Sequence, residues 1–153
     1  MLRKILAGAA CAGLGVVLGV ATFSSAAPGG GRTVHVIEHA NTDAVIDTGE
    51  EGDTSGDLLT FHNPVYDASN KTKVGHDQGE CTRISPEAGT WECRWVTYLK
   101  GGHITVEGPF NDTHDTSLAI TGGTGAYRNA AGEMALKSRN GGTQFDFVYE
   151  LSP

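Results

Sequence analysis

The sequence of 153 residues predicts an all-β fold, an eight-stranded antiparallel β-barrel with a shape similar to that of a lipocalin. From Thr33 onward no window shows convincing helical periodicity, while several segments alternate apolar and polar residues with period two. Glycine pairs separate these short, evenly spaced segments, which is typical of a barrel that closes to remove its edges. Eight strands enclose an interior large enough for a packed core or one small ligand.

The expected strands follow one another along the whole of the domain. They are residues 32–39, 57–66, 73–84, 90–99, 103–110, 117–123, 131–138 and 143–151. Two of them place several aromatic residues on one face, because side chains alternate along a strand. These residues are Trp91 and Trp95 in one strand and Phe145, Phe147 and Tyr149 in the other. We expect both faces to point inward, where they line a cavity or fill a core.

Residues 1–26 have the layout of a secretory signal peptide. Arg3 and Lys4 precede an apolar run over 5–20, and the small residues that follow suit cleavage after Ala26. The run is shorter than the ~20 apolar residues of a membrane span and is diluted with glycine. The sequence therefore predicts a secreted barrel domain over 27–153, with no stable membrane insertion once the signal peptide is removed.

The chain is acidic, with a formal net charge of −7, and removal of Arg3 and Lys4 makes the mature chain more acidic still. Such a surface argues against nucleic acids and anionic membranes as partners. Acidic residues cluster in DTGEEGDTSGD at 47–57, which has almost no apolar content. We expect this segment to be a solvated linker or mobile loop.

Two cysteines of the expected domain, Cys81 and Cys93, flank the turn sequence PEAG at 86–89. If the flanking segments form a hairpin, Cys81 lies opposite Cys93 or one step away. Because the domain is expected to be exported, the sequence predicts a disulfide between them. A zinc site would need more ligands of this type at short spacing, so we expect no metal.

The stretch LTFHNPVYD at 59–67 carries an amide into an apolar strand. Leu59, Phe61 and Asn63 share one face if the stretch is extended, so Asn63 is expected to point inward. Pro64 biases Asn63 toward extended geometry and interrupts the ladder of hydrogen bonds. Asn63 therefore points either at a ligand or at its own backbone, at a bulge.

Five stretches, taken in order, resemble the allene oxide cyclases and, more distantly, the dirigent proteins that share their barrel. They are GDLLTFHNPVYD at 56–67, VGHDQGEC at 74–81, GGHITVEGPF at 101–110, LAITGGTGAYRNAAGEMAL at 118–136 and FDFVYEL at 145–151. Dirigent proteins share chiefly the GGTGAYRNAAGE segment, so the cyclases are the more similar family. The resemblance spans residues 56–151, which is most of the expected domain.

The resemblance implies a barrel, usually a homotrimer, whose apolar cavity is entered from one end and which uses no metal or organic cofactor. In the plant cyclases the cavity takes an unsaturated fatty-acid allene oxide, whose epoxide opens and closes to a cyclopentenone. Such catalysis acts mainly by holding the substrate in one conformation. A few polar groups stabilise the charge that develops. The expected partner is therefore an apolar small molecule.

The resemblance also implies roles for individual residues. The family's inward asparagine, which holds a water beside the epoxide oxygen, falls on Asn63, and its charge-stabilising glutamate falls on Glu38. The family's second asparagine would fall on Ala40, and a proline soon after it has no counterpart. The ligand-contacting side chains expected in the cavity are Phe61, Cys81, Trp91, Trp95, Phe145, Phe147 and Tyr149.

Each of these roles has a simpler alternative. Glu38 could be a solvated strand carboxylate, and Cys81 is more easily explained by the disulfide than by chemistry. His62 and His76 lie near the expected cavity, yet their spacing favours no acid or base role over a place on the surface.

Three functions stay open from the sequence. The first is a secreted cyclase or isomerase, and as an enzyme it would be a cofactor-independent isomerase. The second is a dirigent-like protein that guides an intermediate made by another enzyme. The third is a packed structural or binding barrel without chemistry, because fold does not imply function. The volume of the cavity distinguishes the third from the other two.

Overall fold

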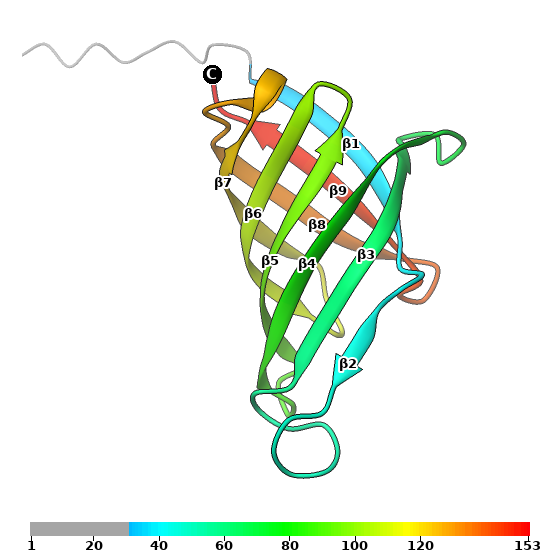
Figure 1. Cartoon of the computed structure of the whole chain (residues 1–153), viewed down its shortest axis with the longest axis vertical. Helices are drawn as coiled ribbons and strands as arrows, with labels where there is room; N and C mark the ends of the chain where they lie inside the picture. Colours follow the sequence, from blue (N-terminus) through cyan, green and yellow to red (C-terminus); the bar gives the residue numbers. More distant parts are fainter. Residues whose placement is uncertain (1–30) are drawn as a thin grey trace, which may run out of the picture.

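The computed structural model describes residues 31–153, so the expected signal peptide lies outside the described residues. One antiparallel sheet of nine strands wraps into a barrel (Figure 1). The strands are β1 Arg32–His39, β2 Ala44–Ile46, β3 Leu58–Asp67, β4 Lys73–Ser85, β5 Thr90–Leu99, β6 Gly102–Asn111, β7 Thr116–Gly123, β8 Gly132–Arg139 and β9 Gln144–Leu151. A single 3-10 turn, Gly125–Tyr127, connects β7 to β8. Within residues 31–153, no helix is long and apolar enough to cross a membrane.

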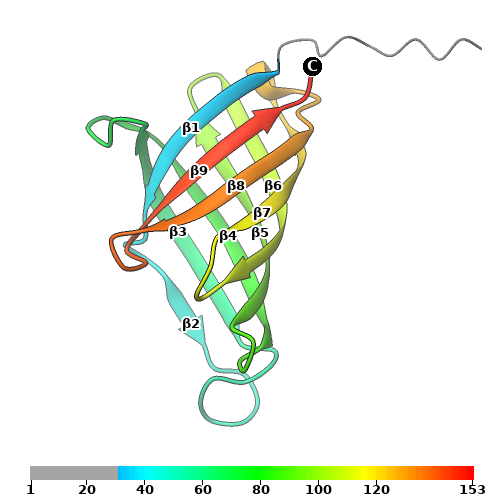
Figure 2. The ribbon, with the colours of Figure 1, turned by 180° about the vertical axis from the view of Figure 1, so that it is seen from behind.

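The barrel closes at β1, which pairs with β9 on one side and with β3 on the other (Figure 2). Strands β3 to β9 each pair with the next one along the chain, so eight long strands form a closed ring. This confirms the predicted eight-stranded antiparallel barrel. The short β2 is an addition that the sequence did not predict, and it pairs only with Leu58, Leu59 and Thr60 of β3.

One side of β3 has a gap in its strand pairing. β2 pairs with residues 58–60 and β1 with residues 65–67, so residues 61–64 face the connecting segment 40–43, which we call the strap. Pro64 lies in this gap. Because proline has no N–H to donate, it is tolerated where no strand pairs. The nearby irregularity in register lies on the β4 side, at Val65 and Tyr66, and not at Asn63.

The hairpin of β4 and β5 forms as predicted. Cys81 and Cys93 lie directly opposite each other and form a disulfide. The turn between the strands is closed by the N–H of Gly89, which donates to the carbonyl of Pro86 at 3.1 Å. A crosslink of this loop length contributes roughly 3 kcal/mol to stability.

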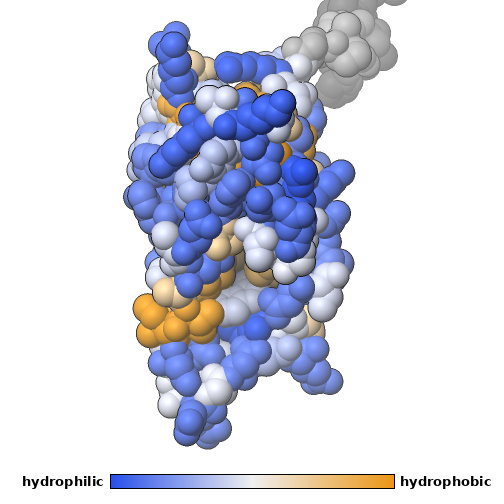
Figure 3. Space-filling view, turned by 90° about the vertical axis from the view of Figure 1, so that its right-hand side faces the viewer, coloured by the Kyte–Doolittle hydropathy of each residue, from blue (hydrophilic) through white to orange (hydrophobic). Residues whose placement is uncertain are grey.

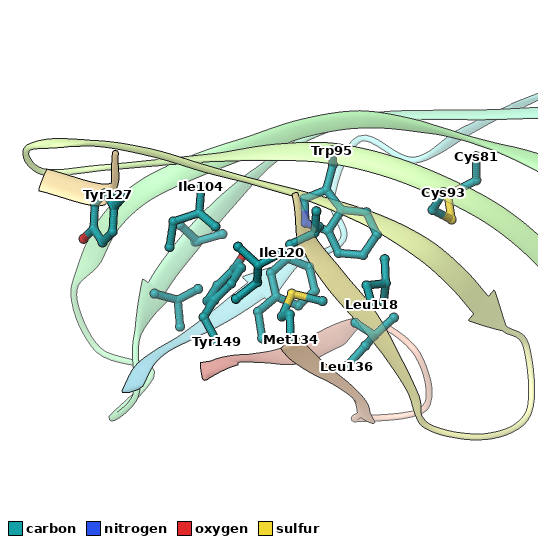
Figure 4. Close-up of a cluster of buried hydrophobic side chains, with 14 of the residues drawn as sticks. Cys81, Cys93, Trp95, Ile104, Leu118, Ile120, Tyr127, Met134, Leu136 and Tyr149 are labelled. Carbon is teal, nitrogen blue, oxygen red and sulfur yellow. A yellow bond between two sulfur atoms is a disulfide. The ribbon is translucent and has the colours of Figure 1, made fainter. Parts of the chain in front are cut away.

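The apolar core occupies the interior of the barrel. Inward side chains of all eight long strands pack into one cluster, and Figure 4 shows how it runs from Tyr127 and Ile104 through Trp95 to the disulfide. Gly79 is opposite Trp95 in the β4–β5 register. A Cβ at Gly79 would overlap that of Trp95, so this glycine allows the tryptophan to pack against the strand.

The acidic segment between β2 and β3 is mostly exposed, as its composition predicts, but hydrogen bonds hold it against the end of the barrel. The guanidinium of Arg83, which is buried, donates to Asp53 at 2.7 Å and to Asp112 at 2.6 Å. It also stacks on the ring of Trp91, 4.1 Å from the centroid. The carboxylate of Asp57 accepts two backbone N–H groups of the segment. The segment is tied to the end of the barrel because a buried guanidinium needs acidic partners.

Candidate functional site

A cavity of about 50 Å³ lies inside the barrel, at the level where β2 replaces β1 beside β3. Its walls are mostly apolar and aromatic. They are formed by Leu59, Phe61, Cys81, Cys93, Trp95, Phe110, Leu136, Phe145 and Phe147, with Glu38 and Asp43 as the polar groups. Figure 3 shows a hollow on this side of the molecule next to an apolar patch. Val45 and Ile46 of β2, the strand beside this part of β3, are exposed apolar residues, at 61% and 48% exposure.

The structure brings together most of the side chains that the sequence placed in a cavity. Phe61, Cys81, Trp95, Phe145 and Phe147 all contribute to the wall, and Glu38 lies at its polar end.

Two of the expected wall residues lie elsewhere. Trp91 is at the end of the barrel, where its indole N–H donates to Asp112 at 2.9 Å. Tyr149 is buried in the core, with its hydroxyl 2.6 Å from that of Thr97. Strand alternation gave the correct face for both residues, but it does not say at which height along the barrel the cavity lies.

Asn63 is fully buried, and its amide is hydrogen-bonded on all sides. Its Oδ1 accepts the N–H groups of Asn41 and Thr42, each at 2.9 Å, and the Thr42 hydroxyl at 3.0 Å. Its Nδ2 donates to Glu38 and to Asp43, each at 2.7 Å. The side chain therefore replaces the missing strand pairing, holding the strap to β3 and fixing the carboxylate of Glu38.

Glu38 is on β1 and points into the barrel, where it is 5% exposed. Burial raises the pKa of its carboxyl from 4.5 to about 7, and the negative charge of Asp43 raises it as well. The hydrogen bonds from Asn63 and Asp77 act in the opposite direction. Glu38 is thus the buried ionisable group that reaches the cavity, and it titrates near neutral pH.

Asp77 is a site residue that the sequence reasoning missed. It is fully buried on β4, directly opposite Asn63, and its Oδ1 accepts the backbone N–H of Asn63 at 3.2 Å. Burial first, and then the charge of Glu38, hold the pKa of Asp77 well above its usual range. The sequence did carry a signal, because Asp77 shares the inward face of its strand with Gly79 and Cys81.

A row of polar side chains crosses the barrel at one end of the cavity. Asn63, Asp77 and Thr97 are neighbours on β3, β4 and β5. The row is one inward position along the strands from Phe61 and Trp95, which line the cavity. Within residues 31–153, no group of three or more His, Cys, Asp or Glu side chains is arranged to hold a metal ion.

The two histidines near the expected cavity lie outside the barrel. His62 is exposed, and its ring is 4.8 Å from that of His76. The ring of His76 stacks in turn on Tyr98 at 4.7 Å, on the outer surface of the sheet. Neither ring is part of the cavity wall.

Comparison with known proteins links this barrel to a family. A family model described as allene oxide cyclase matches residues 34–149. Among solved structures, the chain is similar to a pyocyanin demethylase, with a TM-score of 0.69 and 25% identity over 79% of this chain and 100% of that one.

Two further solved structures share the fold at lower identity. One is a pterocarpan synthase dirigent protein, with a TM-score of 0.65 and 19% identity over 77% of this chain and 83% of that one. The other is an exo-specific intermolecular Diels-Alderase, with a TM-score of 0.65 and 15% identity over 82% of this chain and 100% of that one.

Proposed function

Because the chain belongs to the allene oxide cyclase family, we propose that its barrel binds an apolar, unsaturated small molecule and steers its cyclisation or isomerisation. The observation that carries this proposal is a cavity with aromatic walls that ends at the buried carboxyl of Glu38. Ligand sites commonly combine apolar walls with a few placed polar groups. We also expect secretion and a homotrimer, as the sequence and the family suggest.

The residues would divide the work in a simple way. The aromatic walls would hold the unsaturated part of the ligand in one conformation, which lowers the entropic part of the barrier to ring closure. Glu38 would contact the polar atom at which charge develops. Asn63 would act as a positioning residue, because its own amide is fully engaged by Glu38, Asp43 and the strap.

The size of the cavity restricts the ligand. A water needs about 10–15 Å³ by this measure, so about 50 Å³ accommodates a few waters or a compact organic group. A long hydrocarbon chain does not fit inside. The proposed ligand is therefore compact, or it extends past β2 to the outside of the barrel.

The test is the stereochemistry of a reaction that also occurs without the protein. The purified protein is incubated with a short-chain polyunsaturated epoxide, and product chirality is compared with that of the spontaneous reaction. We expect one enantiomer in excess, and racemic product at the spontaneous rate would refute the proposal for this ligand class.

Matched variants then connect any chirality to the cavity. Leu59→Trp fills the cavity and should abolish the enantiomeric excess. Thr121→Trp places the same side chain at an exposed position on β7 and should leave the excess unchanged. Glu38→Gln should lower the rate by about 100-fold or more, as expected for loss of a group that stabilises developing charge.

A dirigent-like role in guiding an intermediate made by another enzyme would use the same cavity. The small cavity favours this dirigent-like role, because guiding an intermediate requires contacts with part of it and not enclosure of the whole molecule. In that case the protein alone would not accelerate the reaction, but it would impose chirality on the product of an added oxidant.

A further inference from the structure

We propose that Glu38 and Asp77 form the acid–base pair of the cavity, in which Glu38 faces the ligand and exchanges protons with it, and Asp77 holds a proton of its own and positions Glu38 from behind. The inference rests on the proposed function and adds a ligand class to it. The ligand would carry an oxygen that gains or loses a proton, as an enol, a phenol or a carbonyl compound does.

The first argument is the environment of the Asp77 carboxyl. Its Oδ1 accepts the N–H of Asn63, whereas no N–H or hydroxyl group of residues 31–153 donates to its buried Oδ2. A buried carboxylate oxygen without a donor is strongly unfavourable. A protonated Oδ2 needs an acceptor instead, and the buried carboxyl of Glu38, which binds the amide of the same Asn63 at 2.7 Å, is the acceptor that we assign to it. Asp77 is thus the member of the pair that holds the proton.

The second argument is the absence of a compensating cation. Within residues 31–153, neither Glu38 nor Asp77 forms an ion pair with Lys, Arg or His. Two buried carboxylates next to each other cannot both stay ionised without one. One proton therefore remains on the pair when ordinary carboxyls have lost theirs.

The groups that face the pair are uncharged, apart from one carboxylate. Asn63 of β3 donates to Glu38, and the strap contributes Asp43, whose negative charge favours protonation of Glu38. From β9, burial and the two carboxyls raise the pKa of Tyr149, so its hydroxyl stays neutral. Asp43 is the other carboxyl of the cavity wall, but it is exposed, so Glu38 is the buried carboxyl that faces a ligand.

The proposed step conserves atoms and electrons. Ionised Glu38 removes a proton from an O–H or an activated C–H of the ligand, and the electron pair of the broken bond stays in the ligand's unsaturated system. The ring closes or the double bond shifts, and Glu38 returns the proton to a different ligand atom. Asp77 keeps its own proton and, through the hydrogen bond, stabilises the ionised form of Glu38. The net change is an isomerisation that needs no oxidant or reductant.

The first test needs no ligand. At about pH 9, well above the pKa of about 7 of Glu38, infrared spectroscopy should still detect the C=O stretch of one protonated carboxylic acid. The nearly isosteric Asp77→Asn should remove this band, and Glu107→Gln, at an exposed position, should not. Absence of the band in the wild-type protein would overturn the proposal, whether or not the variant folds. A band that survives Asp77→Asn in the folded variant would do so too.

The second test addresses the ligand class by ¹⁹F NMR with 4-fluorophenol, and with 4-fluorotoluene as the control without a hydroxyl. Between about pH 8 and about pH 5, binding of 4-fluorophenol should weaken roughly tenfold, because protonated Glu38 loses a charge-assisted hydrogen bond. Binding of 4-fluorotoluene should not change, and Glu38→Gln should remove the pH dependence. Equal pH dependence of both probes would refute the ligand class.

The two proposals fail in different ways. Absence of the protonated-carboxyl band at about pH 9 together with chiral product from the epoxide would reject the acid–base pair and keep the proposed function. The band of a protonated carboxyl together with racemic product would support the pair and reject cyclisation of that epoxide.

Discussion

Raising the pH from about 5 to about 8 should destabilise the folded barrel through Glu38. Burial raises the pKa of Glu38 from 4.5 to about 7, with a further contribution from Asp43. Above its unfolded pKa of 4.5, the folded state therefore keeps a proton that the unfolded chain has released. The stability associated with this proton is fully present below pH 4.5 and is lost as the pH rises through about 7.

The size of the effect follows from the two pKa values. The difference between 4.5 and about 7 corresponds to roughly 3 kcal/mol of unfolding free energy, at about 1.4 kcal/mol per tenfold change in proton affinity. Solvent screening reduces this little, because Glu38 is 5% exposed. Carboxyls with a lowered pKa, such as Asp67 with a pKa of about 2, make stability rise with pH, but this change lies below the pH range of the experiment.

The assay is urea unfolding of the oxidised protein at about pH 5, 6, 7 and 8, followed by the fluorescence of the two buried tryptophans. Wild-type stability should fall across this series, and Glu38→Gln should reduce the slope, while the part due to the raised pKa of Asp77 remains. Glu107→Gln, which removes an exposed carboxyl, should follow the wild type. Stability that is constant or rises from pH 5 to pH 8, or a slope that is as steep in Glu38→Gln as in the wild type, would refute the reasoning.

Three further predictions concern stability at fixed pH. Asn63→Ala should lower the unfolding free energy by about 3 kcal/mol, because it removes two hydrogen bonds to carboxyls. The control Asn41→Ala changes an exposed side chain and should alter the unfolding free energy by less than about 0.5 kcal/mol. Equal urea midpoints for the two variants would contradict this prediction. Arg83→Leu should lower the unfolding free energy by about 2 kcal/mol and make the 47–57 segment sensitive to limited proteolysis. The control Arg94→Leu breaks an exposed ion pair and should have neither effect. Reduction of the β4–β5 disulfide should lower the unfolding free energy by roughly 3 kcal/mol. An unchanged urea midpoint after verified reduction would contradict this value.

The strands could be predicted from the sequence because their signal is local. Alternation within ten residues is enough to identify a strand such as β9 and its inward face, and the turn at 86–89 sets the register that places Cys81 opposite Cys93. Observed strand ends differ from the predicted ones by at most one residue, because the last pairing of a strand depends on its neighbours.

The site was only partly predictable because its geometry is set by contacts between distant segments. The side-chain partners of Asn63 are Glu38 and residues of the strap, twenty or more residues earlier in the chain, and no spacing rule connects them. β2 was not predicted because a strand of three residues is too short to show an alternation of apolar and polar residues. Asp77 was missed because an aspartate in a strand normally indicates solvent, although it shares the inward face of β4 with Cys81; its pairing with Asn63 in the structure confirms that it is buried.

The strap also has a consequence for how such a barrel can diverge. A backbone ladder holds two strands together largely regardless of their side chains, so point mutations rarely open it. At the strap, β3 is instead held by two side chains, the amide of Asn63 and the hydroxyl of Thr42, which accepts the N–H of His62 at 2.8 Å. The width of the opening beside β3 therefore depends on a few side chains, and a lineage can change it by substitutions at those positions while the backbone ladders of the other strands stay intact.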